Sequence, residues 1–157
     1  AIVKAGIPVQ GHIGLTPQTA SALGGFKMQG RDASAAKQII DDAKALEDAG
    51  VFSMILEAVP APLGKLVAEA VEVPVIGIGA GPDVDGQVLV THDMVGLFDK
   101  FVPKFVKQYT RIRPVILEAL GAYKKEVQDG VFPGPEHSFK MPAEALGQLK
   151  QMIENSK

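Results

Sequence analysis

Short apolar runs alternate with helical patterns over residues 1–98 of this 157-residue chain. The spacing predicts strands at residues 7–13, 51–56, 73–78 and 87–90, and amphipathic helices at 33–49 and 63–71. Each strand follows a helix or a loop rather than a hairpin turn, so we expect parallel pairing with crossover helices. Such units form a doubly wound sheet or a barrel. Because four strands are too few to close an eight-stranded barrel, the pattern predicts half of a barrel.

The pattern changes after Asp93. Helical spacing covers residues 101–128, where we expect Pro114 to kink or divide the helix. A loop rich in glycine and proline follows at 130–137, and a last helix is expected at 143–153. The C-terminal region has more helices than a barrel needs for its closure, so we expect some of them to pack on neighbouring subunits.

The start of the chain is unusual for a domain. Ala1 lies in what reads as the last turn of a helix, which Gly6 ends. We therefore expect a fragment: a single partial domain over residues 1–157, with barrel strands and helices in 1–98 and C-terminal helices in 99–157.

Composition narrows the class of protein. The net charge of -2 argues against an electrostatic partner such as nucleic acid. The absence of cysteine from the sequence excludes disulfides and thiolate chemistry. The longest apolar runs are far short of a membrane span, and no signal-peptide pattern opens the chain, so we expect no membrane partner and a cytoplasmic location.

Glu57 is the leading candidate for a general base. It follows the apolar run Ser-Met-Ile-Leu, and Pro60 and Pro62 begin a loop shortly after it. Its carboxylate is therefore expected at the carboxyl edge of the sheet, where parallel sheets bind ligands. The alternative is a solvated loop carboxylate or an ion pair with Lys65.

Three histidines and one glycine-rich loop are weaker candidates. His12 ends the first predicted strand, where its ring could donate to a substrate or simply to a backbone carbonyl. The segment 77–86 could approach a phosphate closely or make a tight turn. His92 and Asp93 are expected to end the fourth strand, with no spacing diagnostic of a metal site. His137 is expected to be structural or part of a lid.

Several separated motifs then point to one family. The run Gly-Ile-Pro-Val-Gln-Gly-His-Ile-Gly-Leu-Thr-Pro-Gln occupies residues 6–18, and Leu-Glu-Ala-Val-Pro occupies 56–60. Further matches lie at residues 24–31, 74–81, 92–93 and 133–139. In this order the motifs resemble ketopantoate hydroxymethyltransferase, over nearly the whole chain.

The resemblance implies a (β/α)₈ TIM-type barrel, of which this chain is the second half with extra C-terminal helices. It implies hydroxymethyl transfer from 5,10-methylenetetrahydrofolate to 3-methyl-2-oxobutanoate, giving 2-dehydropantoate in pantothenate biosynthesis. Glu57 corresponds to the base that removes the proton beside the carbonyl, and His12 to a contact with the substrate carboxylate or carbonyl. A homo-oligomer is also implied.

Magnesium holds the oxoacid and stabilises the enolate in such an enzyme. The family's metal ligands belong upstream of Ala1, so we expect none in this chain. Two alternatives remain. One is a non-catalytic module that acts in assembly through its C-terminal helices. The other is a different enolate-forming barrel enzyme, such as an oxoacid lyase, against which the Gly-His-Ile-Gly-Leu-Thr-Pro motif argues.

Overall fold

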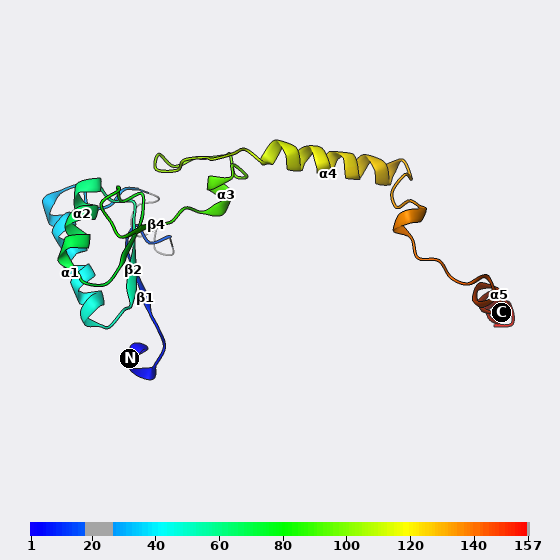
Figure 1. The fold of residues 1–157 in the computed structure, drawn as a ribbon, viewed down its shortest axis with the longest axis horizontal. Helices are drawn as coiled ribbons and strands as arrows, with labels where there is room; N and C mark the ends of the chain where they lie inside the picture. The colour runs from blue at the N-terminus through cyan, green and yellow to red at the C-terminus, as the bar shows by residue number, and fades with distance from the viewer. Residues whose placement is uncertain (18–26, 157) are drawn as a thin grey trace. The chain divides into compact units, whose positions relative to one another are not determined.

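The computed structural model describes residues 1–17 and 27–156 (Figure 1). Gln18, the last residue of the motif at 6–18, and the Gly-Gly-Phe part of the motif at 24–31 lie outside the described residues. A 3₁₀ turn over Val3–Ala5 opens the chain, and Gly6 ends it with a left-handed backbone, as predicted.

A four-stranded parallel sheet forms the centre of the fold, in the order β1-β2-β3-β4. The strands are β1 (Gln10–Gly14), β2 (Ser53–Glu57), β3 (Val75–Ile78) and β4 (Gly86–Gln87). The predicted parallel pairing is therefore confirmed. β1 and β3 begin later than predicted, after Pro8 and Pro74, because proline has no N–H to give to a ladder.

Two helices connect the strands. α1 (Ala33–Asp48) begins at Asp32, whose side chain accepts a hydrogen bond of 2.9 Å from the backbone N–H of Ala35. The local sequence offers Asp32 and Ser34 as N-caps, and the structure uses Asp32, which satisfies one of the first-turn donors that a helix leaves unpaired. α2 (Ala61–Ala70) has Pro62 in its first turn, where a missing N–H is harmless.

The two faces of the sheet differ in burial. On one face, Met54, Leu56 and Val75 are fully buried and pack with residues of α1 and α2 in the hydrophobic core. Figure 1 shows both helices on this side of the strands. The other face carries the alternate residues, which are mostly half-buried. Their strand register is Gln10↔Ser53, His12↔Ile55↔Ile76 and Gly14↔Glu57↔Ile78. We call this second face the open face.

The segment after β4 differs from the prediction. His92 and Asp93 do not end a strand: β4 stops at Gln87, and both residues lie in the short helix α3 (Thr91–Met94). Residues 101–112 are not helical, and α4 (Arg113–Gln128) begins only at Arg113. Pro114 therefore does not kink a helix. It lies in the first turn of α4, the position that proline tolerates best.

Tertiary contacts explain why the helical spacing of 101–112 is overridden. The N–H of Tyr109 donates to the carbonyl of Met94 at 2.8 Å, instead of to a carbonyl one helical turn earlier. The ring of Phe105 packs against the backbone of Gly79 in the loop after β3. Pro103 lies inside the segment and also lacks the N–H that a helix interior requires.

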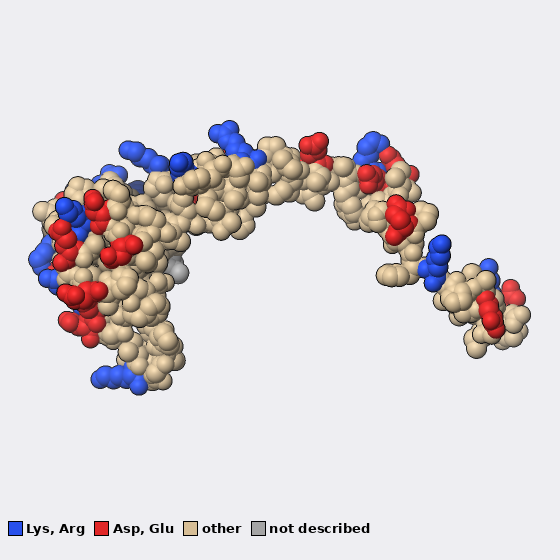
Figure 2. Space-filling model, viewed as in Figure 1, with Lys and Arg blue, Asp and Glu red and all other residues tan. Residues whose placement is uncertain are grey.

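The chain divides into two units, Ala1–Arg111 and Ile112–Lys157. The second unit contains α4, a 3₁₀ turn over Pro135–His137 and α5 (Ala143–Glu154). Large apolar side chains on its helices are exposed, among them Val115, Leu117, Leu120, Leu149 and Met152. Among the described residues, no helix is long and apolar enough to cross a membrane. On the face shown in Figure 2, Lys and Arg side chains lie among Asp and Glu side chains.

Candidate functional site

The open face brings the two leading candidates together. His12 lies in the middle of β1 and Glu57 is the last residue of β2, and their side chains meet through His12 Nε2 and Glu57 Oε2 at 3.1 Å. The Glu57 side chain is 14% exposed and that of His12 is 31% exposed. Glu57 is thus neither a solvated loop carboxylate nor a partner of Lys65, whose ion pair is with Glu69 at 3.8 Å.

Gly14 allows this approach. It lies opposite Glu57 in the strand register, with a left-handed backbone at φ +81°. A Cβ atom on Gly14 would lie 2.3 Å from the Glu57 carbonyl oxygen and 3.1 Å from Val59 Cγ1. A side chain at this position would therefore force β1 away from the end of β2.

The backbone around Glu57 is held from both neighbouring strands. The Glu57 carbonyl accepts from the Leu15 N–H at 2.9 Å, on the β1 side. Ala58 donates to the carbonyl of Ile78 at 2.9 Å, on the β3 side. Ala58 also adopts φ +51°, a left-handed conformation that L-residues other than Gly, Asn and Asp seldom adopt, and its carbonyl accepts from Gln29. These bonds fix where the carboxylate points.

A second polar pair lies on the same face. Gln10 Nε2 donates to Ser53 Oγ at 2.8 Å, and Ser53 is buried. We did not single out these residues from the sequence. The signal was present, however, because Gln10 and His12 are two apart on one strand, as are Ser53, Ile55 and Glu57 on the next. Period-2 spacing places all of them on one face.

The glycine-rich segment 77–86 packs closely against other parts of the chain. A Cβ on Gly79 would lie 2.6 Å from the Phe105 ring, and one on Gly81 would lie 2.4 Å from Ala61 Cβ. A Cβ on Gly77 would lie 2.8 Å from Val84 Cγ2. The space that these glycines leave is thus filled by neighbouring side chains, which favours the tight-turn interpretation over a phosphate cradle.

The remaining histidines do not join the site. His92 lies in α3 rather than on the sheet. His137 accepts a hydrogen bond from the Gly134 N–H at 3.2 Å, and its ring centroid is 5.0 Å from that of Phe132. These contacts give His137 a structural role within its own turn.

No group of three or more His, Asp or Glu side chains among residues 1–17 and 27–156 is arranged to hold a metal ion. The described part of the chain therefore does not fit a magnesium ion by itself.

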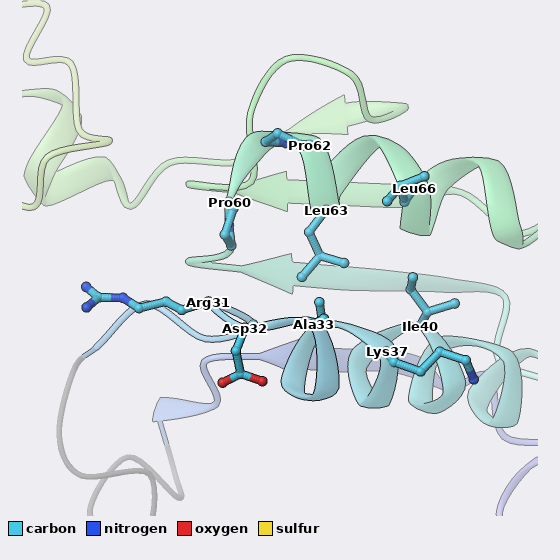
Figure 3. A pocket seen from close by; sticks show the side chains of 11 residues that line it. Arg31, Asp32, Ala33, Lys37, Ile40, Pro60, Pro62, Leu63 and Leu66 are labelled. Atoms are coloured by element: carbon cyan, nitrogen blue, oxygen red, sulfur yellow. The ribbon is translucent and has the colours of Figure 1, made fainter.

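Among the described residues, two cavities lie near the sheet: the first is away from Glu57 and the second is near it. One, of about 500 Å³, lies between α1 and α2 (Figure 3). Leu63 of α2 points toward Ala33 of α1 and Ile40 of α1 points toward Leu66 of α2, while Arg31 extends away. These helices cover the sheet face opposite Glu57, so this cavity is separate from the carboxylate. The second, of about 490 Å³, lies beyond the carboxyl end of β3, between the loop that begins at Gly79 and the segment that includes Phe105.

Comparison with known proteins identifies the family to which the chain belongs. The sequence profile described as Ketopantoate hydroxymethyltransferase matches residues 1–135. The 3-methyl-2-oxobutanoate hydroxymethyltransferase of Heliobacterium modesticaldum is 59% identical over 147 residues, which is 94% of this chain and 53% of that protein. The enzyme of the same name from Syntrophobacter fumaroxidans is 60% identical over 141 residues, 90% of this chain and 50% of that protein. This chain thus spans about half the length of the curated relatives it matches, and it belongs to the ketopantoate hydroxymethyltransferase family.

Proposed function

We propose that this chain supplies the catalytic base for hydroxymethyl transfer from 5,10-methylenetetrahydrofolate to 3-methyl-2-oxobutanoate, giving 2-dehydropantoate. The reaction belongs to pantothenate biosynthesis. The single observation that carries the proposal is the Glu57–His12 pair at the carboxyl edge of the sheet, 3.1 Å apart and partly shielded from solvent. Membership of the family supports the same assignment.

Glu57 acts as the base in this scheme. Its carboxylate takes the proton from C3 of the oxoacid, and the electron pair of that C–H bond forms an enolate with the neighbouring carbonyl. The C3 atom then bonds to the methylene carbon of the folate as that carbon's bonds to nitrogen break. Water adds its oxygen to the methylene carbon as the hydroxyl group. Its remaining hydrogen and the proton that Glu57 took from C3 restore the two N–H groups of the departing tetrahydrofolate. A positioned base of this kind typically contributes about 10²–10⁴-fold to the rate.

His12 holds the base in place. A ring nitrogen at 3.1 Å from Oε2 restricts rotation of the Glu57 carboxylate. Because the His12 ring lies beside the Glu57 carboxylate, it would also contact the carboxylate or carbonyl of an oxoacid bound next to Glu57. We propose both roles for His12, with orientation of Glu57 as the one that the free protein uses.

The magnesium ion of this family requires ligands that the described residues do not provide. The complete enzyme would contain them in the half of the relatives' length that this chain does not cover. We accordingly propose that the four-stranded sheet is the second half of a (β/α)₈ barrel. Residues 1–98 would form the strands and helices of that half, and some of the C-terminal helices within residues 99–157 would serve homo-oligomer contacts.

The test is exchange of the C3 proton of 3-methyl-2-oxobutanoate in deuterated water, followed by NMR, in the complete enzyme that carries this sequence. Glu57→Gln should lower the exchange rate by about 10²-fold or more, because the amide cannot accept the proton. Glu69→Gln is the matched control, since Glu69 is an exposed carboxylate on α2. Retention of exchange in Glu57→Gln at the rate of the Glu69→Gln control would rule Glu57 out as the base.

A second candidate function is a non-catalytic assembly module. The exposed apolar side chains on α4 and α5 favour it. If this function is correct, the protein will form oligomers in sedimentation experiments but show no exchange of the C3 proton, even with added magnesium.

A further inference from the structure

The cavity beyond β3 lies beside Glu57 in the sheet. Glu57 is the register partner of Ile78, the last residue of β3, and Gly79 follows directly after that strand. The Val59 N–H, two residues after Glu57, donates to the Gly79 carbonyl at 3.2 Å. The cavity begins at Gly79. The cavity therefore reaches the carboxyl edge of the sheet one strand away from Glu57.

Residues 101–112, for which the sequence spacing predicts a helix, contribute one wall of this cavity. Phe105, Lys107 and Tyr109 all line it, facing Gly79 and Gly81 of the loop after β3. The ring of Phe105 packs on Gly79, where any side chain would collide with it. Because the Tyr109 N–H is bonded to Met94, the segment is held at both the loop and α3. The wall is thus part of the folded first unit.

The lining combines three kinds of group. Phe105 and Tyr109 provide aromatic surface, which stacks on flat heterocycles. Lys107 Nζ lies 4.8 Å from the centroid of the Tyr109 ring, a cation–π contact that holds the charge at the cavity. Gln87 donates to the Gly81 carbonyl at 2.8 Å, which places its amide in the lining. A ligand that suits this set is a flat, hydrogen-bonding heterocycle with a carboxylate.

The proposed reaction requires a ligand of that chemistry at this place. The methylene carbon must come within roughly 3–3.5 Å of the C3 atom that Glu57 deprotonates. The donor must therefore open onto the carboxyl edge beside Glu57. A volume of about 490 Å³ falls in the range of small-molecule sites.

We propose that this cavity binds the reduced folate, with the ring system against Phe105 and the glutamate carboxylate at Lys107. The proposal rests on the proposed function for the identity of the donor. It assigns a second substrate site to a different set of residues from the Glu57–His12 pair.

The experiment is calorimetric titration of the complete enzyme with 5-formyltetrahydrofolate, a reduced folate that carries no transferable methylene bridge. Lys107→Ala should raise the Kd about fivefold, the effect of one partly exposed ion pair. Lys107→Arg should restore most of the affinity, because the positive charge is kept. Lys104→Ala is the control: Lys104 is exposed on the same segment and does not line the cavity.

A second probe locates the charge contact on the ligand. 6-Methyltetrahydropterin lacks the glutamate, so its affinity should be the same in Lys107→Ala and in the parent protein. If Lys107→Ala and Lys104→Ala bind 5-formyltetrahydrofolate equally well, or if the parent does not bind it, the cavity is not the folate site.

The C3 exchange assay separates this proposal from the proposed function, because exchange needs no folate. Lys104→Ala should leave exchange unchanged, whereas Glu57→Gln should remove it and leave folate affinity intact. If exchange is lost in Glu57→Gln but the folate Kd is the same in Lys107→Ala and in the parent protein, only the cavity assignment is overturned. Folate affinity that depends on Lys107, without any exchange, would support the cavity and overturn the proposed reaction.

Discussion

At the scale of single residues, the position of Glu57 depends on neighbours that carry no chemistry. His12 contacts the carboxylate, but Gly14 and Ala58 determine where the backbone of Glu57 lies. Gly14 leaves room for the Glu57 carbonyl, and Ala58 turns the chain in a left-handed conformation immediately after Glu57. The geometry of the site thus rests on the backbone of two small residues.

The first prediction concerns Gly14→Ala. The added Cβ would meet the Glu57 carbonyl at 2.3 Å, and alanine at φ +81° is strained as well. We expect a loss of about 2 kcal/mol or more in the free energy of unfolding, measured by urea titration. Gly121→Ala is the control, because Gly121 lies within α4 with nothing within 4 Å of its Cβ position. That variant should be neutral or slightly stabilising, and equal losses in both would contradict the argument.

A second prediction tests coupling between His12 and Glu57. In a double-mutant cycle on C3 exchange, His12→Ala should slow exchange about tenfold by freeing the carboxylate to rotate. In the Glu57→Gln background the same change should have little further effect, because residues that act as a unit are not additive. Additive losses would show that His12 acts on the substrate independently of Glu57.

At the scale of elements, helix α1 illustrates a boundary that sequence predicts well. The local sequence offers Asp32 and Ser34 as N-caps, and Asp32 is the one that the structure uses, because its side chain accepts a hydrogen bond from the nearby Ala35 N–H. The segment 101–112 illustrates the opposite case. Its helical spacing is real, but Phe105 packs against Gly79 and Tyr109 bonds Met94. Contacts with distant residues outweigh the weak local preference for helix.

The third prediction is made at the α1 N-cap. Asp32→Ala should lower the free energy of unfolding by about 1 kcal/mol, since the Ala35 N–H would lose its acceptor. Asp32→Asn should retain nearly all of the stability. The matched control is Asp42→Ala, which removes an exposed carboxylate from the middle of α1 without touching the cap. A thermal melt followed by circular dichroism distinguishes the three variants.

At the scale of the whole molecule, the first unit is built around one covered face of a parallel sheet. Parallel sheets in proteins usually have both faces buried. Here the core lies between the sheet and α1 and α2, and the open face carries His12 and Glu57 with partial burial. This asymmetry is what half of a closed barrel would present, which agrees with the proposal for the complete enzyme.

The fourth prediction concerns how much the covered face of the sheet contributes to the free energy of unfolding. Leu56 is fully buried in the core, so Leu56→Ala should cost about 2–5 kcal/mol in the free energy of unfolding. Leu66 carries the same side chain on α2 but is 52% exposed, and Leu66→Ala should cost well under half as much. Comparable costs for the two variants in urea unfolding would mean that the core does not lie where the structure places it.

The sequence by itself determined the parallel α/β sheet, the existence of four strands, the cap of α1 and the placement of Glu57 at a strand end, because these follow from local spacing and capping chemistry. It also carried the motifs of the family. Only the tertiary structure decided that His12 contacts Glu57, that Gly14 makes room for this contact, and that residues 105–109 wall a cavity rather than form a helix. Those outcomes depend on the register between strands and on packing between segments tens of residues apart, which no local pattern contains.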